Sequence, residues 1–196
     1  MQRIRIKYKK EMKFIGHLDM VRLWERALRR TDLPAAYSEG FNPRQKLSFG
    51  PPLPLGFTSE CELLDIYFEK WVNPEQTKNL LSSTLPKGIE IIEAGNVFLA
   101  RASITAEIKT AVYSADVSGD ISEKISEVLG SKEIIVQRKE KDFNIRPMIK
   151  ELSQSGNTVN IAVQCDNFGS IKAQELTGMF KENLTGTFRR IALYCS

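Results

Sequence analysis

The chain has little of what most familiar enzyme sites require. Its 196 residues include one histidine, His17, and three cysteines, Cys61, Cys165 and Cys195, that lie far apart in the sequence. They form no C-x-x-C pair and no metal-ligand spacing, which argues against a zinc site or a disulfide framework and is typical of a reduced, cytosolic setting. The sequence also lacks the G-x-S-x-G, P-loop, H-E-x-x-H and G-x-G-x-x-G motifs, so it indicates no common hydrolase, metalloprotease or nucleotide-cofactor site.

Long apolar runs are also missing. No stretch of about 18 apolar residues occurs, so the sequence predicts no membrane span. Residues 1–7 alternate charged and apolar side chains, unlike the apolar core of a signal peptide. Hydrophobic residues make up 42% and charged residues 27% of the chain, a balance typical of folded globular proteins. We therefore expect a cytoplasmic protein with one domain or two small ones.

Positive charge is concentrated in the first quarter of the chain. Residues 1–50 contain 12 Lys and Arg against 5 Asp and Glu, a net charge of +7, whereas residues 51–196 have a net charge of −3. Such a local excess favours an anionic partner, and nucleic acid is the commonest one. The alternative is that these side chains only keep an amphipathic surface solvated.

The most unusual segment is residues 37–56, which we call the proline-rich loop. It contains four of the chain's eight prolines and three of its twelve glycines. Prolines fix φ and glycines allow conformations closed to other residues, so the segment is suited to a rigid, irregular path. Rigid loops of this kind commonly present side chains for binding.

Hydrophobic periodicity predicts an α+β protein made of two tandem ferredoxin-like (β-α-β-β-α-β) units with antiparallel sheets. The first domain, residues 1–100, contains the basic helix and the proline-rich loop, and the second covers residues 106–196. In the first, we expect a helix at 74–85 with Asn73 as its N-cap. The other first-half elements are strands at 2–9, 62–72 and 89–98, a helix at 18–30, and a short extended stretch at 46–49. In the second half, the pattern favours strands at 108–117, 134–138, 158–164 and 188–194 and helices at 121–129 and 170–180.

The predicted helix at 18–30 is the strongest candidate for an anion-binding surface. Its apolar stripe faces one way, and Arg22, Arg26, Arg29 and Arg30 fall within an arc of about 100° on the opposite side. Guanidinium groups present forked donors that suit phosphate oxygens. Glu25 is spaced to pair with Arg29 along the helix, whereas Arg26 and Arg30 have no obvious local acid.

Phe41, Arg44 and Lys46 of the proline-rich loop complete the candidate RNA-binding residues. For Phe41 and for Phe49, burial within the loop is favoured over stacking on a base. His17 is a weaker, catalytic candidate. With a pKa near 6.5 it would suit general acid–base chemistry, but it could equally cap the helix or pack beside Trp24.

Several motifs resemble a known but poorly characterised family. They are Gly16-His17-Leu18-Asp19, Glu25-Arg26-Ala27-Leu28-Arg29-Arg30, Leu33-Pro34, residues 37–44 and 46–49, and the later Asn144-Ile145-Arg146-Pro147-Met148-Ile149. Together they are similar to the radical SAM-associated domain family of unknown function, whose members are fused to, or encoded beside, radical SAM proteins. The resemblance implies a radical SAM protein as partner. Because the chain lacks three closely spaced cysteines, the iron–sulfur cluster and SAM are expected only in that partner, and this chain needs no cofactor or metal of its own.

Three functions follow as hypotheses. The first is a non-catalytic accessory module that binds tRNA or rRNA and works with a radical SAM enzyme. The resemblance also suggests this role, because family members are often encoded near ribosomal-protein and ribonuclease genes. The second is a protein adaptor that docks the radical SAM partner. The third is a metal-independent endoribonuclease that uses His17.

Overall fold

The first half of the chain contributes four strands and two helices to the computed structural model, which describes residues 1–166 and 169–195. These elements are β1 (Gln2–Lys10), α1 (His17–Arg29), β2 (Leu47–Phe49), β3 (Thr58–Phe68), α2 (Pro74–Thr84) and β4 (Ile89–Val97). They follow the predicted order closely. The Asn73 side chain caps α2 as expected, because its Oδ1 accepts from the backbone N–H groups of Glu75 and Gln76 at 2.9 and 3.1 Å.

Within the described residues, the second half contains three further helices, a 3-10 turn and seven strands. They are α3 (Ile104–Glu107), β5 (Ile108–Asp116), α4 (Ser122–Gly130), β6 (Ile135–Arg138), β7 (Lys141–Asn144), the 3-10 turn Arg146–Met148, β8 (Ile149–Ser155), β9 (Thr158–Asp166), β10 (Gly169–Ser170), α5 (Ala173–Met179) and β11 (Arg189–Cys195). Residues 167, 168 and 196 of the second predicted domain lie outside the described residues.

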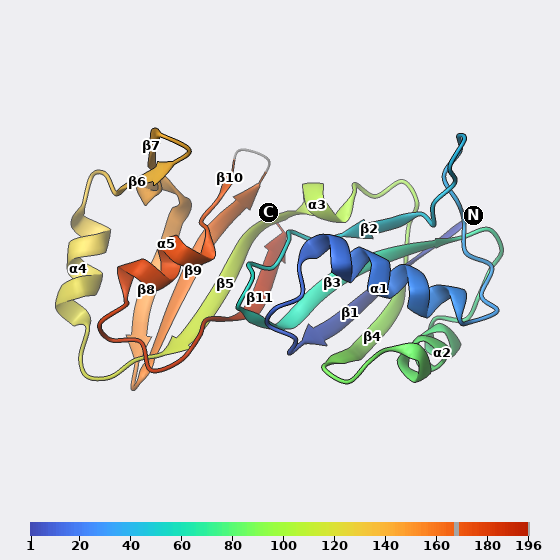
Figure 1. Cartoon of the computed structure of the whole chain (residues 1–196), viewed down its shortest axis with the longest axis horizontal. Coiled ribbons are helices and arrows are strands. Elements are labelled where there is room, and N and C mark those ends of the chain that lie inside the picture. Colours follow the sequence, from blue (N-terminus) through green and yellow to red (C-terminus); the bar gives the residue numbers. More distant parts are fainter. Residues whose placement is uncertain (167–168, 196) are drawn as a thin grey trace.

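Nine of the described strands form one sheet that extends through both halves (Figure 1). Its main path is β10-β9-β5-β11-β3-β1-β4, with β2 paired to β3 and β8 paired to β9. Among the described strands, only the β11–β3 pair is parallel, and it is short, joining Arg189 to Thr58 and Arg190 to Ser59. The predicted α+β class with a mainly antiparallel sheet is confirmed. The tandem ferredoxin-like units and the division at residues 100–106 stay predictions.

One predicted strand lies outside the main sheet. β6, expected at 134–138 as a member of the second-half sheet, pairs only with β7 in a separate two-stranded sheet. Its expected place beside β9 is taken by β8, which the sequence pattern did not predict. The apolar residues Ile149 and Leu152 are three positions apart and do not show the period of two that identifies a strand. Both can still be buried, because the register of β8 against β9 shifts between Ile149 and Glu151.

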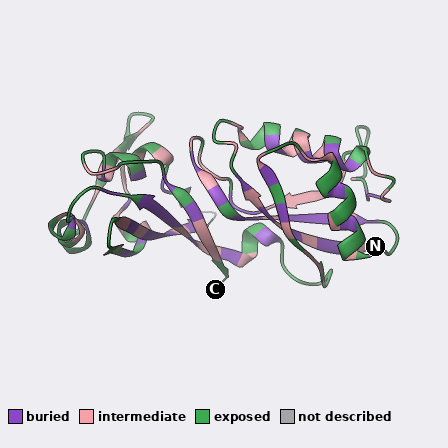
Figure 2. Cartoon of the chain, turned by 90° about the horizontal axis from the view of Figure 1, so that it is seen from below, coloured by how far each residue is buried: buried purple, intermediate pink, exposed green. Residues whose placement is uncertain are grey.

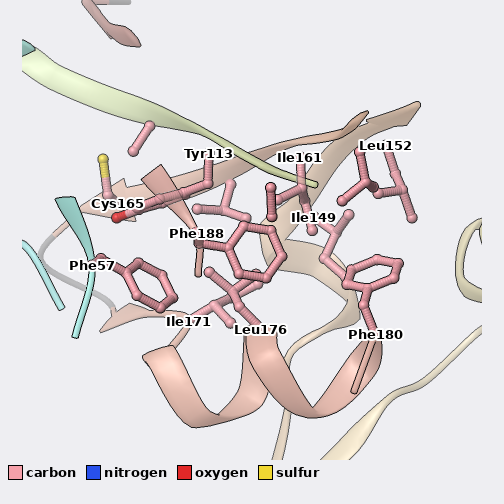
Figure 3. Packing of buried hydrophobic residues seen from close by; sticks show 14 of the residues in the cluster. Phe57, Tyr113, Ile149, Leu152, Ile161, Cys165, Ile171, Leu176, Phe180 and Phe188 are labelled. Atoms are coloured by element: carbon pink, nitrogen blue, oxygen red, sulfur yellow. The ribbon is translucent and has the colours of Figure 1, made fainter. Parts of the chain in front are cut away.

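Two hydrophobic cores lie against the sheet. In the first half, Trp24 of α1 is buried against Tyr8 of β1, with ring centroids 5.0 Å apart. In the second half, Phe180 and Phe188 pack with residues of β5, β8 and β9 (Figure 3). Phe57, which follows the proline-rich loop, belongs to this second core, because its ring lies against Tyr113 and Phe188. The loop is thereby attached to both halves of the molecule.

Burial follows the layers of the fold. Figure 2 shows mostly buried strands and helices whose outer faces are exposed. Within the described part of the chain, no helix is both long and apolar enough to cross a membrane.

Candidate nucleic-acid interface

Helix α1 turns its arginines away from the sheet. Its buried residues are Met20, Trp24, Ala27 and Leu28, so the apolar stripe packs on the first core. The side chains of Arg22, Arg26, Arg29 and Arg30 are all exposed. The predicted division of α1 into a core face and a cationic face is therefore confirmed.

Two grooves run along this cationic face. The first has a volume of about 510 Å³ and is lined by Arg22, Arg26 and Arg30, with Thr84, Leu85 and Pro86 at the C-terminal end of α2 forming the opposite wall. The second, about 350 Å³, lies on the other side of α1 and is lined by Arg22, Arg29 and Arg44. Arg22 lines both grooves. Arg44, which belongs to the proline-rich loop and lies 14 positions beyond Arg30, therefore shares a groove with arginines of α1.

We call these five exposed side chains, Arg22, Arg26, Arg29, Arg30 and Arg44, the arginine surface. Local partners engage it only weakly. Arg22 pairs with Asp19 at 3.2 Å, both side chains being well exposed, and such pairs are worth at most about 1 kcal/mol. The expected Glu25–Arg29 carboxylate pair is not formed, because Arg29 donates instead to the backbone carbonyl of Glu25 at 3.3 Å. The guanidinium groups are therefore available to an external anion.

Beside the arginine surface, residues 38–44 form a short protruding hairpin (Figure 1, upper right). Two hydrogen bonds between Ser38 and Arg44 close the base of the hairpin. The Ser38 N–H donates to the Arg44 carbonyl at 2.7 Å, and the Ser38 hydroxyl accepts from the Arg44 N–H at 3.0 Å. Gly40 has φ of +118°, a conformation that favours glycine. At the tip, Phe41 is fully exposed (101%). The favoured expectation that Phe41 is buried within the loop is wrong, whereas Phe49 is half-buried against the first core.

Lys46 is less available than the arginines. Its side chain is half-buried, and its backbone joins the loop to neighbouring segments through hydrogen bonds with Ala36 at 2.7 Å and Tyr67 at 3.2 Å. Neither Lys46 nor Phe41 lines the two grooves. The structure thus brings five of the seven predicted RNA-binding residues together along two grooves, whereas Phe41 and Lys46 lie outside these grooves, in the same loop as Arg44.

The rigid path of the loop depends on Arg190, which sequence analysis did not select. Arg190 is 1% exposed and donates to the carbonyl oxygens of Pro51 and Pro52 at 2.9 and 3.0 Å. It also pairs with Glu62 at 2.9 Å and donates to the Tyr113 hydroxyl at 2.7 Å. Although burial disfavours the charge, the Glu62 carboxylate and the Tyr113 hydroxyl raise the pKa of Arg190. β11 therefore holds the loop through a buried cation.

A second buried ion network fastens the segment that joins the halves. Asp65 of β3 is fully buried and accepts from Arg3 and Arg5 at 2.8 and 2.7 Å. Arg5 also pairs with Glu107 at 2.8 Å. Burial alone would raise the pKa of Glu107, but the hydrogen bond and charge of Arg5, helped by Arg101, lower it. The polar face of β1, expected to face solvent, is covered here by residues 101–107.

His17 begins α1 and is exposed. Its ring packs edge-on against Phe49, with centroids 5.5 Å apart. It does not cap α1, which has no side-chain cap, and Trp24 packs on Tyr8 instead. His17 lines a groove of about 520 Å³ together with Arg44, Phe49 and Pro52. No group of three or more His, Cys, Asp or Glu side chains suited to a metal ion occurs within residues 1–166 and 169–195.

Comparison with known families places these features in context. A family model described as an uncharacterized protein conserved in bacteria (DUF2344) matches residues 3–173. The chain belongs to this family. The match includes the whole arginine surface, the proline-rich loop and His17, and it ends before Arg190. Comparison with curated proteins finds no match.

Proposed function

We propose that this DUF2344 protein is a non-catalytic accessory module that binds a structured RNA, tRNA or rRNA, and works with a radical SAM enzyme. The observation that carries the proposal is the arginine surface, where five exposed guanidinium groups line two grooves on either side of α1. Grooves about this cationic helix suit the phosphate backbone of RNA. Phe41 stands beside them as a stacking platform, since base–aromatic stacking contributes about 1–3 kcal/mol per base.

A double charge reversal tests the RNA-binding part. Arg26→Glu with Arg30→Glu removes two groups from one groove wall and should weaken binding of a tRNA or rRNA fragment, measured by filter binding at low salt. The matched control is Lys132→Glu with Lys181→Glu, which makes the same charge change on exposed residues. These residues follow α4 and α5 by two positions each, and both helices lie toward the opposite end of the molecule from α1 (Figure 1). Equal weakening by both variants would contradict a specific role for the arginine surface.

Docking of a protein is a second candidate, favoured by an exposed apolar patch. Phe14, Leu18 and Leu55 are 84%, 71% and 59% exposed, and a 2.8 Å hydrogen bond from the Gly56 N–H to the Lys13 carbonyl brings their segments together. Contiguous apolar patches commonly mark protein contacts. Co-purification with a radical SAM protein that survives the Arg26 and Arg30 reversals but is lost in Phe14→Glu with Leu55→Glu would favour the adaptor.

The endoribonuclease hypothesis has a direct test. Labelled RNA incubated with the protein and EDTA should stay intact if the module is non-catalytic. Cleavage that is lost in His17→Ala would replace the accessory role with a catalytic one.

The fold that we infer for this role is a tandem of two ferredoxin-like units. The strand orders β4-β1-β3-β2 and β11-β5-β9-β8 both support it, because each has the 4-1-3-2 order of a β-α-β-β-α-β unit.

A further inference from the structure

A small recess lies where β1 ends and α1 begins. Lys10, Gly16, His17, Phe49 and Glu62 are among the residues that line it, and its volume is about 20 Å³. A cavity of this size holds about one water molecule or one oxygen atom of a ligand. The recess adjoins the 520 Å³ groove, since His17, Phe49 and Gly50 line both. A ligand in the groove can therefore place one oxygen in the recess.

Lys10 is the unusual member of this recess. It is 3% exposed, and within the described residues its Nζ has no hydrogen-bond partner. Buried ammonium groups almost always have partners, because leaving such a donor unpaired is costly. Glu62, the carboxylate that lines the same recess and attracts the Lys10 ammonium group, is already paired with Arg190 at 2.9 Å. Two cations thus accompany one anion around the recess, which leaves it net positive.

The start of α1 adds to this positive potential. Gly16 is the N-cap residue of a 13-residue helix and supplies no side-chain acceptor, so the first backbone N–H groups have no cap. The helix dipole places partial positive charge at the same point. Asp19 in the first turn is exposed and engaged by Arg22. An unpaired ammonium and an uncapped helix N-terminus therefore meet at one recess.

We propose that this recess binds an oxygen of a phosphate group, with Lys10 and the N-terminal N–H groups of α1 as donors and His17 at the entrance. The phosphate belongs to a ligand that lies in the adjoining groove, either a terminal phosphate of RNA or a small phosphorylated molecule. None of the arginine-surface residues lines the recess itself, although Arg44 lines the adjoining groove. The proposal does not depend on RNA binding along α1. Burial lowers the pKa of Lys10, with Glu62 opposing the shift, and a bound phosphate would favour the ammonium form.

Thermal unfolding in inorganic phosphate and in chloride, at equal ionic strength and pH, tests the proposal. Phosphate at about ten times its Kd should raise the Tm of the wild-type protein by about 3–6 °C relative to chloride. Lys10→Met should abolish this difference, and it should raise the Tm in chloride by about 2 °C or more, because an unpaired buried charge is removed. Lys9→Met is the matched control, since Lys9 is the neighbouring residue and pairs on the surface with Glu90; it should keep the phosphate effect.

The opposite result for Lys10 overturns the proposal. If Lys10→Met lowers the Tm in chloride and the phosphate effect persists, Lys10 is a structural residue whose partner is a buried water. Should Lys10→Met fail to fold, Gly16→Asp decides the matter. A Cβ at Gly16 has open space apart from Asp19 Oδ2 at 3.8 Å, and the new carboxylate would occupy the helix N-terminus and cancel the phosphate effect. An undiminished effect in Gly16→Asp would count against the site.

The source of the phosphate is distinguished by comparing the Tm of the protein with two RNA oligonucleotides. An RNA oligonucleotide with a 5′-phosphate that raises the Tm more than its 5′-hydroxyl form identifies an RNA end. Equal Tm values for the two oligonucleotides, with stabilisation retained in inorganic phosphate, identify a small phosphorylated ligand. The single histidine gives an independent readout, because its imidazole NMR signal should shift on phosphate addition in the wild-type protein and not in Lys10→Met. No shift in either protein would contradict binding at the recess.

Discussion

Replacement of Arg190 by methionine should uncouple the proline-rich loop from the sheet. The guanidinium donates to two loop carbonyls, those of Pro51 and Pro52, and neutralises Glu62. Methionine fills much of the same volume but donates no hydrogen bond. The substitution leaves Glu62 as an unpaired carboxylate whose side chain is 9% exposed, together with carbonyl oxygens that have lost their donor.

The magnitude follows from these losses. Breaking a buried ion pair by removing one partner costs about 3–5 kcal/mol. Lys10 lies within electrostatic reach of Glu62 and offsets part of the lost charge, so we expect about 3 kcal/mol. Total stabilities of domains are about 5–15 kcal/mol, and the variant should remain folded but clearly weakened. Arg189→Met is the matched control, because Arg189 pairs with Glu60 on the exposed side of the same strand, where such pairs contribute at most about 1 kcal/mol.

Urea unfolding measures both variants. Arg190→Met should lower the free energy of unfolding several times more than Arg189→Met. Adding Glu62→Leu to Arg190→Met should recover part of the loss, because no unpaired carboxylate remains. Arg190→Met costing no more than Arg189→Met would refute the account of Arg190 as the loop's buried anchor.

Three further predictions concern local features. Asn73→Ala should lower the free energy of unfolding by about 1 kcal/mol in urea titrations, since the α2 cap is lost; an unchanged midpoint would contradict the cap. At pH 8 a thiol reagent should modify exposed Cys195 rapidly and Cys61 slowly, because burial raises the pKa of Cys61 to about 11; equally fast reaction at both thiols would contradict the burial of Cys61. The folded-state pKa of Glu107 lies below its usual 4.5, mainly through Arg5 acting against burial. Its contribution to stability is therefore complete above pH 4.5 and is lost as pH falls through the lowered pKa, so Glu107→Gln should flatten the acid limb of a stability–pH curve; an identical limb would exclude this contribution.

Much of the first half could be predicted from local sequence patterns. Alternation identified β1, the three-to-four spacing of apolar residues identified α1, and Asn73 before Pro74 marked the start of α2. These signals are local, because each depends on residues within one or two turns or strand repeats. The arginine arc could be predicted for the same reason, since helix geometry alone fixes it.

The residues that the sequence did not reveal depend on contacts between distant segments. Alternation assigns Arg3 to the polar face of β1, and the predicted strand ends before Lys10. Nothing local shows that residues 101–107 cover Arg3 or that α1 and the loop cover Lys10. Arg190 is equally ordinary in its own strand. It becomes an anchor because β11 joins β3 and meets carbonyls about 140 positions away. Burial of polar residues of this kind is a property of the tertiary fold and leaves no periodic signal.

The salt dependence of RNA binding tests the central claim most directly. If each of the five arginines neutralises one phosphate, log Kobs should fall with log salt with a slope of about −3.5 to −4.5, a loss of about 100- to 500-fold between 50 and 200 mM KCl. Arg26→Glu with Arg30→Glu should make this slope shallower by about 1.4 to 1.8, while Lys132→Glu with Lys181→Glu should leave it unchanged. Binding that is absent at low salt, or that does not depend on salt, would contradict an RNA-binding role for the arginine surface.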